Sequence, residues 1–350
     1  MPSSPMLTAT PGPTTTLTAS PANGQAPAVV DDHSAGWDPV SRRVILQAWP
    51  ADMTSAPTTW AWDGLLWSQL SPQHQLPAQR EASMAVDPVS GRLLLMGGTS
   101  LSSPADPTVQ PQWGSNDGTW LWTGSDWNRV ADNPTQGGHP ALAADDATGR
   151  LVVNCPNILG VETPSGVGPG QLTLPMPSPS WAGQGSFSWT GSAWVAAGGS
   201  VPLVLNAAVG YDPISRRVIQ FGGQIQGNVD QTAAFDGSSW TLLQPVHVPP
   251  YGAAVGATDA ALGYLVVLAN PLDNPNLATT WTWNGADWIR QVVNEPPATA
   301  LEGYRGPNSQ MLWDPAVNRV VLIGRSSNAS PTLSVWAWTG TDQGWQILGP

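Results

Sequence analysis

Short apolar runs recur along the chain, each preceded and followed by turn residues. Runs such as Val44-Ile45-Leu46 and Leu93-Leu94-Leu95 are too short for helices and have no polar face. A continuous apolar run of this length predicts a strand that is covered on both faces. The six runs are Val44–Leu46, Leu93–Leu95, Leu151–Val153, Val218–Ile219, Leu265–Val267 and Val320–Leu322.

Each run follows a second strand signal that ends at an aspartate, and these aspartates recur about every fifty residues. They are Asp38, Asp87, Asp145, Asp212, Asp259 and Asp314. Five residues after the aspartate stands an arginine, except in the fifth copy, which has Tyr264. The residues between, such as Pro39 and Ser41, predict a tight turn, which we expect the Asp and Arg side chains to brace.

A third pattern, Trp-x-Trp-(Asp/Asn/Thr)-Gly-x-x-Trp, completes each repeat. It spans Trp60–Trp67 first and returns in altered form near residues 120–127, 187–194, 235–240, 281–288 and 336–345. Asp63-Gly64 and its counterparts predict two-residue hairpin turns with positive φ. We expect the indoles to fill the space between neighbouring sheets; the alternative is an aromatic ligand surface.

Six repeats of four strands predict an all-β fold, a six-bladed β-propeller of four-stranded blades. The blades fall at approximately 33–80, 81–138, 139–205, 206–252, 253–306 and 307–350. Residues 1–32 are rich in Pro, Thr and Ser and predict an extended N-terminal tail or linker. A stretch such as residues 14–18 could add a strand to an open sheet edge.

The composition excludes several partners. The net charge is −12 and all twelve basic residues are arginine, which argues against nucleic acid and anionic membrane surfaces. The lone Cys155 excludes an internal disulfide, and no apolar stretch is long enough to predict a membrane span. No leader is visible in this numbering. We expect an extracellular or cell-surface location, with any leader already removed.

The repeat resembles the kelch-type β-propeller repeats of bacterial surface proteins. The closest copy is Tyr211–Gly223, which ends in the double glycine Gly222-Gly223; Gly97-Gly98 is the other retained pair. The resemblance implies a propeller and a tendency toward binding, in a family that includes adaptors, lectin-like proteins and copper radical oxidases. The array starts with a first strand and stops with a fourth, so no strand is predicted to cross between blades 1 and 6. Closure must then come from face packing or from the tail.

Ligand-binding candidates lie in the variable loops of one face of the ring, where specificity usually resides. Trp113 and Trp181 stand in the two long loops between second and third strands, while Arg80, Tyr304 and Arg305 stand in connectors between blades. An aromatic platform with such donors would suit a sugar or a peptide. The alternative is that these loops bury their own tryptophans.

Enzymatic sites have weaker signals. A copper radical oxidase would need a Cys, two Tyr and two His around the metal, and its candidates are Cys155, Tyr251, Tyr304, His74, His139 and His247. No spacing motif joins them, so we expect no metal and no cofactor. Carboxylates for glycan hydrolysis are also few, namely Glu81, Glu162, Glu295 and Glu302.

The sequence therefore predicts a non-enzymatic, surface-exposed interaction or assembly module. In this interpretation the N-terminal tail docks on a neighbouring subunit and builds polymers. The alternative is a carbohydrate-binding propeller that uses the long-loop face. A copper radical oxidase or a glycan-active enzyme is the third interpretation.

Overall fold

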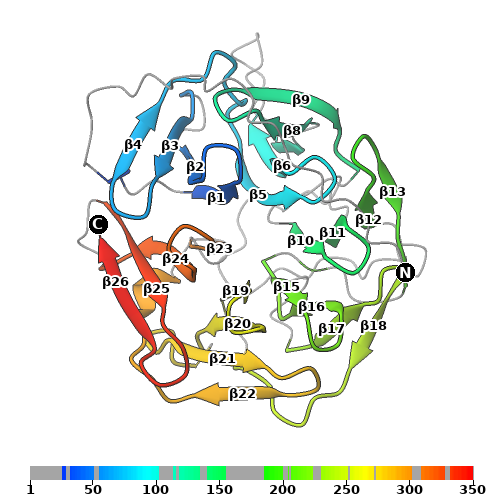
Figure 1. The fold of residues 1–350 in the computed structure, drawn as a ribbon, viewed down its shortest axis with the longest axis vertical. Helices are drawn as coiled ribbons and strands as arrows, with labels where there is room; N and C mark the ends of the chain where they lie inside the picture. Colours follow the sequence, from blue (N-terminus) through cyan, green and yellow to red (C-terminus); the bar gives the residue numbers. More distant parts are fainter. Residues whose placement is uncertain are drawn as a thin grey trace, which may run out of the picture.

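The chain folds into a ring of six β-sheets around a central axis (Figure 1). The structure is a computed structural model, and it describes residues 26–28, 32–50, 55–101, 113–115, 118–134, 140–154, 185–199, 204, 206–223, 230–250, 253–271, 273–301, 309–327 and 332–349. In each sheet four strands follow one another from the axis to the rim, and neighbours among these four are antiparallel. The predicted six-bladed β-propeller of four-stranded blades is confirmed.

The first three blades contain the strands β1–β13. Blade 1 has β1 (Asp32–Asp38), β2 (Arg43–Trp49), β3 (Thr58–Trp62) and β4 (Trp67–Leu70). Blade 2 has β5 (Arg80–Asp87), β6 (Arg92–Leu101), β8 (Gly118–Trp122) and β9 (Trp127–Asp132), and β7 (Trp113–Ser115) pairs with the end of β6. Blade 3 has β10 (Ala141–Asp145), β11 (Arg150–Asn154), β12 (Ser186–Trp189) and β13 (Trp194–Ala196).

The last three blades repeat this order. Blade 4 has β15 (Ala208–Asp212), β16 (Arg217–Phe221), β17 (Thr232–Phe235) and β18 (Ser239–Leu243), and β14 (Gly198–Gly199) adds a parallel strand to its rim. Blade 5 has β19 (Ala254–Asp259), β20 (Tyr264–Ala269), β21 (Thr279–Trp283) and β22 (Trp288–Gln291). Blade 6 has β23 (Gln310–Asp314), β24 (Arg319–Arg325), β25 (Leu333–Trp338) and β26 (Trp345–Gly349).

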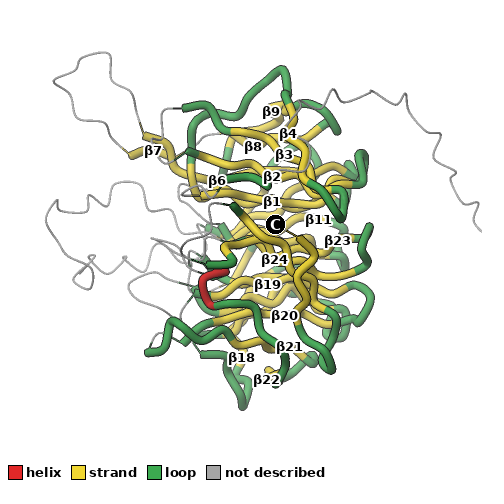
Figure 2. The backbone as a smooth tube through the Cα atoms, turned by 90° about the vertical axis from the view of Figure 1, so that its left-hand side faces the viewer, coloured by secondary structure: helices red, strands yellow, loops and turns green. Residues whose placement is uncertain are grey.

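Helix is almost absent from the described chain. The 3₁₀ turn η2 (Ala298–Ala300) lies in the connector to blade 6, on the same side of the ring as β7 (Figure 2). No helix among the described residues is long and apolar enough to cross a membrane.

The second strand of every blade supplies the core to both of its neighbours. In β2, Val44 and Leu46 pack with side chains of blade 6, whereas Ile45 packs with side chains of blade 2. Six buried apolar clusters result, one at each junction between blades. Side chains of a strand alternate between its two faces, so the continuous apolar runs are those of strands buried on both sides, as predicted.

The repeated tryptophans form the largest buried side chains of these junctions. Trp62 and Trp67 stand opposite each other across the β3–β4 hairpin, with ring centroids 5.4 Å apart. An equivalent pair recurs in each of the five other blades, edge-to-face in blade 5 and tilted in the rest, with Phe235 in place of the first indole in blade 4. Most of these rings are fully buried, so they are core residues rather than a ligand surface.

The hairpin turns of the Trp motif are longer than predicted. Four residues, not two, separate the paired Trp62 and Trp67, because the Asp63 carboxylate accepts the backbone N–H groups of Leu65 and Leu66. Gly64 has the predicted positive φ, +98°. Its Cα lies against Val317 in the first turn of blade 6, and a Cβ there would meet Val317 Cγ1 at 3.2 Å.

Every junction repeats this contact between a turn glycine and the preceding blade. The other pairs are Gly124 with Val40, Gly191 with Val89, Gly237 with Thr148, Gly285 with Ile214 and Gly340 with Leu262. The seam between blades 6 and 1 is thus packed like the five other junctions, and no described strand crosses it. Face packing, one of the two predicted routes to closure, is therefore present at this seam.

The start of the described chain also contributes to the seam. Ala28 forms an antiparallel bridge with Thr332 at the start of β25, and Leu333 N–H donates to the Pro27 carbonyl at 3.1 Å. Ala26 is buried in the cluster between blades 6 and 1. Residues 1–25 lie outside the described residues, so the extended tail and its docking on another subunit stay predictions.

The repeated aspartates brace their turns through the backbone, not through arginine. Asp38 accepts the N–H groups of Val40 and Ser41 and the Ser41 hydroxyl, at 3.2, 3.0 and 2.6 Å. Arg43 stands opposite Asp38 in the strand register, but no ion pair between described residues joins them. The predicted Asp–Arg brace is therefore wrong in its partner, because the turn amides lie closer to the carboxylate.

Two of the turn aspartates accept no hydrogen bond from a side-chain hydroxyl, unlike the other four. In blades 1 to 4, Ser41, Ser90, Thr148 and Ser215 donate to the turn carboxylate. Blades 5 and 6 have Leu262 and Val317 instead, and Oδ2 of Asp259 and of Asp314 is buried without a hydrogen bond. Burial raises the pKa of both carboxyls, and the backbone N–H groups only partly offset this.

Val317→Thr is expected to stabilise the protein by about 1 kcal/mol at neutral pH, since the new hydroxyl can donate to Asp314. The raised pKa of Asp314 means that stability falls as pH rises from the unfolded to the folded pKa. A hydroxyl donor lowers the pKa of Asp314 in the folded protein. The stability gain of Val317→Thr is therefore present above this pH range and disappears below it. Denaturant unfolding at about pH 7 and about pH 3 measures both values. An equal gain at both pH values would contradict this explanation.

Candidate functional site

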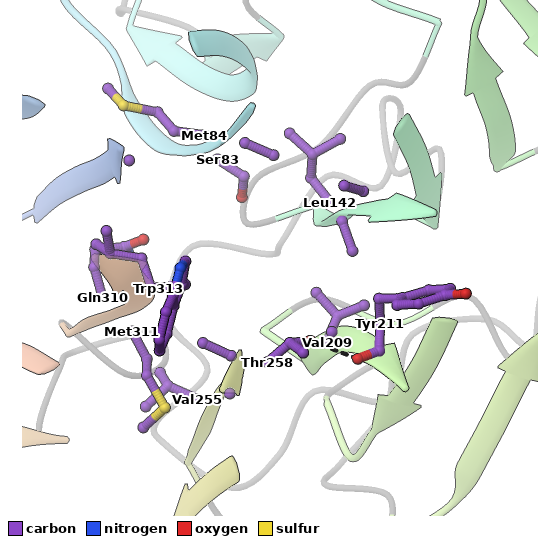
Figure 3. A pocket seen from close by; sticks show the side chains of 18 of the residues that line it. Ser83, Met84, Leu142, Val209, Tyr211, Val255, Thr258, Gln310, Met311 and Trp313 are labelled. Carbon is purple, nitrogen blue, oxygen red and sulfur yellow. Dashed lines mark hydrogen bonds between the residues drawn. The ribbon is translucent and has the colours of Figure 1, made fainter. Parts of the chain in front are cut away.

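The six inner strands β1, β5, β10, β15, β19 and β23 surround a cavity of about 370 Å³ on the ring axis (Figure 3). Small residues allow these strands to converge. A Cβ on Gly210 would lie 2.6 Å from Leu265 Cδ1, and a Cβ on Gly256 would lie 3.2 Å from Ala208 Cβ. The cavity therefore exists at the axis because the neighbouring blades meet there through backbone and short side chains.

Hydroxyls and amides line the end of the cavity where the inner strands begin. Ser83 donates to the Pro140 carbonyl at 2.8 Å, and Gln310 Nε2 donates to the His33 carbonyl at 3.2 Å. Ser309 also lines the cavity; its side chain is 1% exposed, and Oγ has no hydrogen-bond partner among the described residues. A buried hydroxyl without a partner is costly, so a bound molecule that reached Ser309 Oγ would remove this cost.

Aromatic and acidic side chains line the end where the inner strands stop. Trp37 and Trp313 are half-buried and immediately precede the turn aspartates of blades 1 and 6. Figure 3 shows the Trp313 indole projecting into the open space, whereas the Tyr211 ring extends away from it. Trp313 thus offers an aromatic face to the cavity.

Asp146 is the acidic residue of this end. It follows the turn aspartate Asp145 at a position that is proline in four of the other blades. It is an exposed residue that also lines the cavity, and the protein on its inner side desolvates it enough to raise its pKa, with a smaller contribution from the Asp145 charge. No hydrogen bond or ion pair to Asp146 occurs within the described residues. An unpartnered carboxylate with a perturbed pKa in a cavity indicates a functional residue.

The residues predicted from sequence are not brought together at this cavity. Arg80 begins β5 opposite Thr99 and does not line the cavity, and Trp113 begins β7 opposite Leu101. Trp181, Tyr304 and Arg305 lie outside the described residues. The long-loop face thus stays a prediction, while Trp313, Ser309 and Asp146 are site residues that the sequence analysis missed.

The candidates for enzymatic chemistry are also separated where they are described. His74 lies at the junction of blades 1 and 2, and His247 at the junction of blades 4 and 5. Glu295 accepts Thr280 N–H at 2.9 Å and pairs with Arg290 at 2.8 Å. No group of three His, Cys, Asp or Glu within the described ranges could hold a metal ion. Cys155, His139, Tyr251, Glu162 and Glu302 are outside those ranges.

The two histidines form equivalent hydrogen-bonded contacts with aspartates of the neighbouring blades. In each, the His backbone N–H donates to one Asp oxygen at 2.8 Å, and Nδ1 lies 2.6 or 2.7 Å from the other oxygen. The partners are Asp126 and Asp287, in turns of the next blade. Burial alone would raise the pKa of Asp126, but the His74 hydrogen bonds outweigh it and lower the pKa; the His247 backbone bond is the main cause of the lowering at Asp287.

The two His–Asp contacts are expected to stabilise the protein above about pH 3.9, the pKa of an aspartate in the unfolded chain. This effect is lost as pH falls through the lowered pKa of the aspartates in the folded protein. Asp126→Asn should therefore reduce stability at neutral pH and make the acid side of the stability profile flatter. The exposed Asp273 provides the control substitution, Asp273→Asn. Denaturant midpoints between about pH 2 and about pH 7 test this. Parallel acid profiles for Asp126→Asn and the native protein would contradict it.

Comparison with solved structures extends the description of the fold. The structure of YjhT matches over 95% of this chain and 99% of that chain, with 13% sequence identity and a TM-score of 0.55. The Aleuria aurantia lectin in complex with Fucα1-6GlcNAc matches over 92% and 96%, with 12% identity and a TM-score of 0.51. AofleA from Arthrobotrys oligospora matches over 93% and 87%, with 10% identity and a TM-score of 0.50.

Sequence comparisons add no family. No protein-family model matches the chain, and no curated protein is significantly similar to it. The kelch resemblance therefore stays a prediction. At such low identities the solved structures show the fold alone, although one of them is a lectin.

Proposed function

We propose that the protein binds carbohydrate in the axial cavity. The observation that carries the proposal is the Trp313 indole projecting into a cavity of about 370 Å³ (Figure 3). Pockets for small molecules commonly enclose about 300–1,000 Å³ and combine an apolar wall with a few placed polar groups. A pyranose ring matches this arrangement, since its C–H face stacks on an indole while its hydroxyls need donors and acceptors.

The polar groups of the cavity support the same ligand class. Ser309 offers an unpartnered hydroxyl at one end, and Asp146 offers carboxylate oxygens at the other. Both would satisfy sugar hydroxyls, and a ligand hydroxyl would remove the cost of the buried Ser309 Oγ. The similarity to the Aleuria aurantia lectin, solved with a fucosylated disaccharide, further supports a carbohydrate ligand.

The number of carboxylates in the cavity favours a binding function over hydrolysis. Asp146 is the one carboxylate among the described lining residues, whereas glycoside hydrolysis generally uses two. The assembly function, which the sequence analysis placed first, has less support, because the tail residues that remain described, Ala26–Ala28, contact their own blade 6. We also propose that the protein lies at the cell surface or outside the cell, where glycans are encountered.

Calorimetric titration with glucose, fucose, glucosamine and N-acetylglucosamine tests the proposal. We expect saturable binding of at least one sugar and a loss of about tenfold or more in affinity, about 1.4 kcal/mol, on Trp313→Ala. Trp120→Ala is the matched control, since Trp120 is another half-buried indole that does not line the cavity. Absence of binding to every sugar, or equal affinities for native protein and Trp313→Ala, would overturn the proposal.

A further inference from the structure

The cavity has a charge pattern that distinguishes between classes of sugar. Among the described residues that line it, Asp146 is the one side chain with a formal charge at neutral pH, and neither arginine nor histidine lines the wall. The chain has no lysine and carries a net charge of −12. A cavity of this kind attracts cations and repels anions, because its one formal charge is a carboxylate without a cationic partner.

Asp146 is free to meet a ligand, whereas its neighbour Asp145 is not. Asp145 accepts the Ala147 N–H at 3.1 Å and the Thr148 hydroxyl at 2.6 Å, so its oxygens are used within the turn. Its charge nevertheless adds to the negative potential at Asp146. Four other blades have a proline at the position of Asp146, so the turn itself does not require a carboxylate there.

The tryptophans share the end of the cavity that contains Asp146. Trp37 and Trp313 precede the turn aspartates of β1 and β23, and Asp146 follows the turn aspartate of β10. The inner strands are equivalent elements of the ring, so these positions lie at the same end of the axis. Blades 3 and 6 face each other across the ring, so a ligand in the cavity lies between the Asp146 carboxylate on one side and the Trp313 indole on the other, and a cation is favoured by both.

We infer that the cavity selects saccharides with a free ammonium group, that is, amino sugars, over neutral and acidic sugars. The inference rests on the proposed carbohydrate function and specifies its ligand. In this arrangement the sugar spans the cavity, with its ring toward Trp313 of blade 6 and its ammonium group toward the Asp146 carboxylate of blade 3. An acidic sugar would place a second carboxylate beside Asp146 with no cation in the described wall to compensate it.

Three sugars with the same pyranose ring test the selection: glucosamine, glucose and glucuronic acid. Calorimetry at about pH 6.5 keeps the amine protonated, because an amine of this type has a pKa of about 7.7. We expect glucosamine to bind about tenfold more tightly than glucose, and glucuronic acid to bind most weakly. Equal affinities for glucosamine and glucose would overturn the inference but leave the proposed function intact, while absence of all binding would overturn both.

Variants of Asp146 assign the selectivity to one side chain. Asp146→Asn and Asp146→Pro, the second restoring the residue of the other blades, should each bring glucosamine and glucose within about twofold of one another. Asp273→Asn removes an equal charge outside the cavity and should keep the tenfold preference. Thermal unfolding of the variants verifies that they fold. A preference for glucosamine that persists in both folded Asp146 variants would overturn the inference.

Discussion

Trp62→Ala is expected to lower the free energy of unfolding by about 3–5 kcal/mol, the usual cost of removing a buried indole. Trp62 is 1% exposed and lies in the cluster between blades 6 and 1, where it packs with Val321 and Val335 and pairs with Trp67. No described strand crosses this seam, and besides the backbone contacts of Pro27 and Ala28 with the start of β25, apolar packing holds it together. Denaturant unfolding of the variant measures the loss directly.

Trp122→Ala provides the comparison for this seam. Trp122 occupies the same repeat position in blade 2, is fully buried and pairs with Trp127 at 5.0 Å, but it lies at the junction of blades 1 and 2. If the seam is packed like the other junctions, the two variants lose stability by amounts that agree within about 1 kcal/mol. A much smaller loss for Trp62→Ala would show that the ring is held closed by something other than this packing.

Gly98→Ala is expected to cost about 3 kcal/mol or more, because two effects combine at this residue. Gly98 has φ of +97°, a conformation that costs a non-glycine residue about 1–2 kcal/mol. In addition, its Cβ would lie 2.6 Å from the Arg80 carbonyl oxygen, a backbone atom that cannot turn aside. Gly97 and Gly98 form one of the two retained double glycines, and Glu81 on the partner strand is skipped in the register.

Gly91→Ala separates the two effects within the same blade. Gly91 also has positive φ, +63°, but a Cβ there would meet nothing within 4 Å. It should therefore cost only the conformational penalty of about 1 kcal/mol. Denaturant midpoints of both variants give the comparison. Equal losses for Gly98→Ala and Gly91→Ala would show that the close approach to Arg80 has no energetic effect.

The fold could be predicted because each of its elements is repeated six times. Residues such as Asp38 and Trp62 mark the same turn or the same junction in every copy, so a pattern in one dimension fixes an architecture in three. The prediction that Asp38 pairs with Arg43 failed. Spacing along the chain does not show that the N–H groups of Val40 and Ser41 lie close enough to hydrogen-bond the Asp38 carboxylate.

The candidate site could not be predicted in this way, because it consists of departures from the repeat. Trp37 and Trp313 are tryptophans outside the Trp-x-Trp hairpins, and Asp146 replaces a proline. Each departure is visible in the sequence, but only closure of the ring shows that these positions face one cavity. Attention to residues that break a repeat, rather than to long loops such as the one with Trp113, would have found them.

The most direct test is a crystal structure of the protein with bound glucosamine. We expect electron density for one sugar in the axial cavity, with its ring on Trp313 and its ammonium group within hydrogen-bond distance of Asp146. Density for the sugar at a junction between blades or on the long loops, with the axial cavity empty, would contradict it.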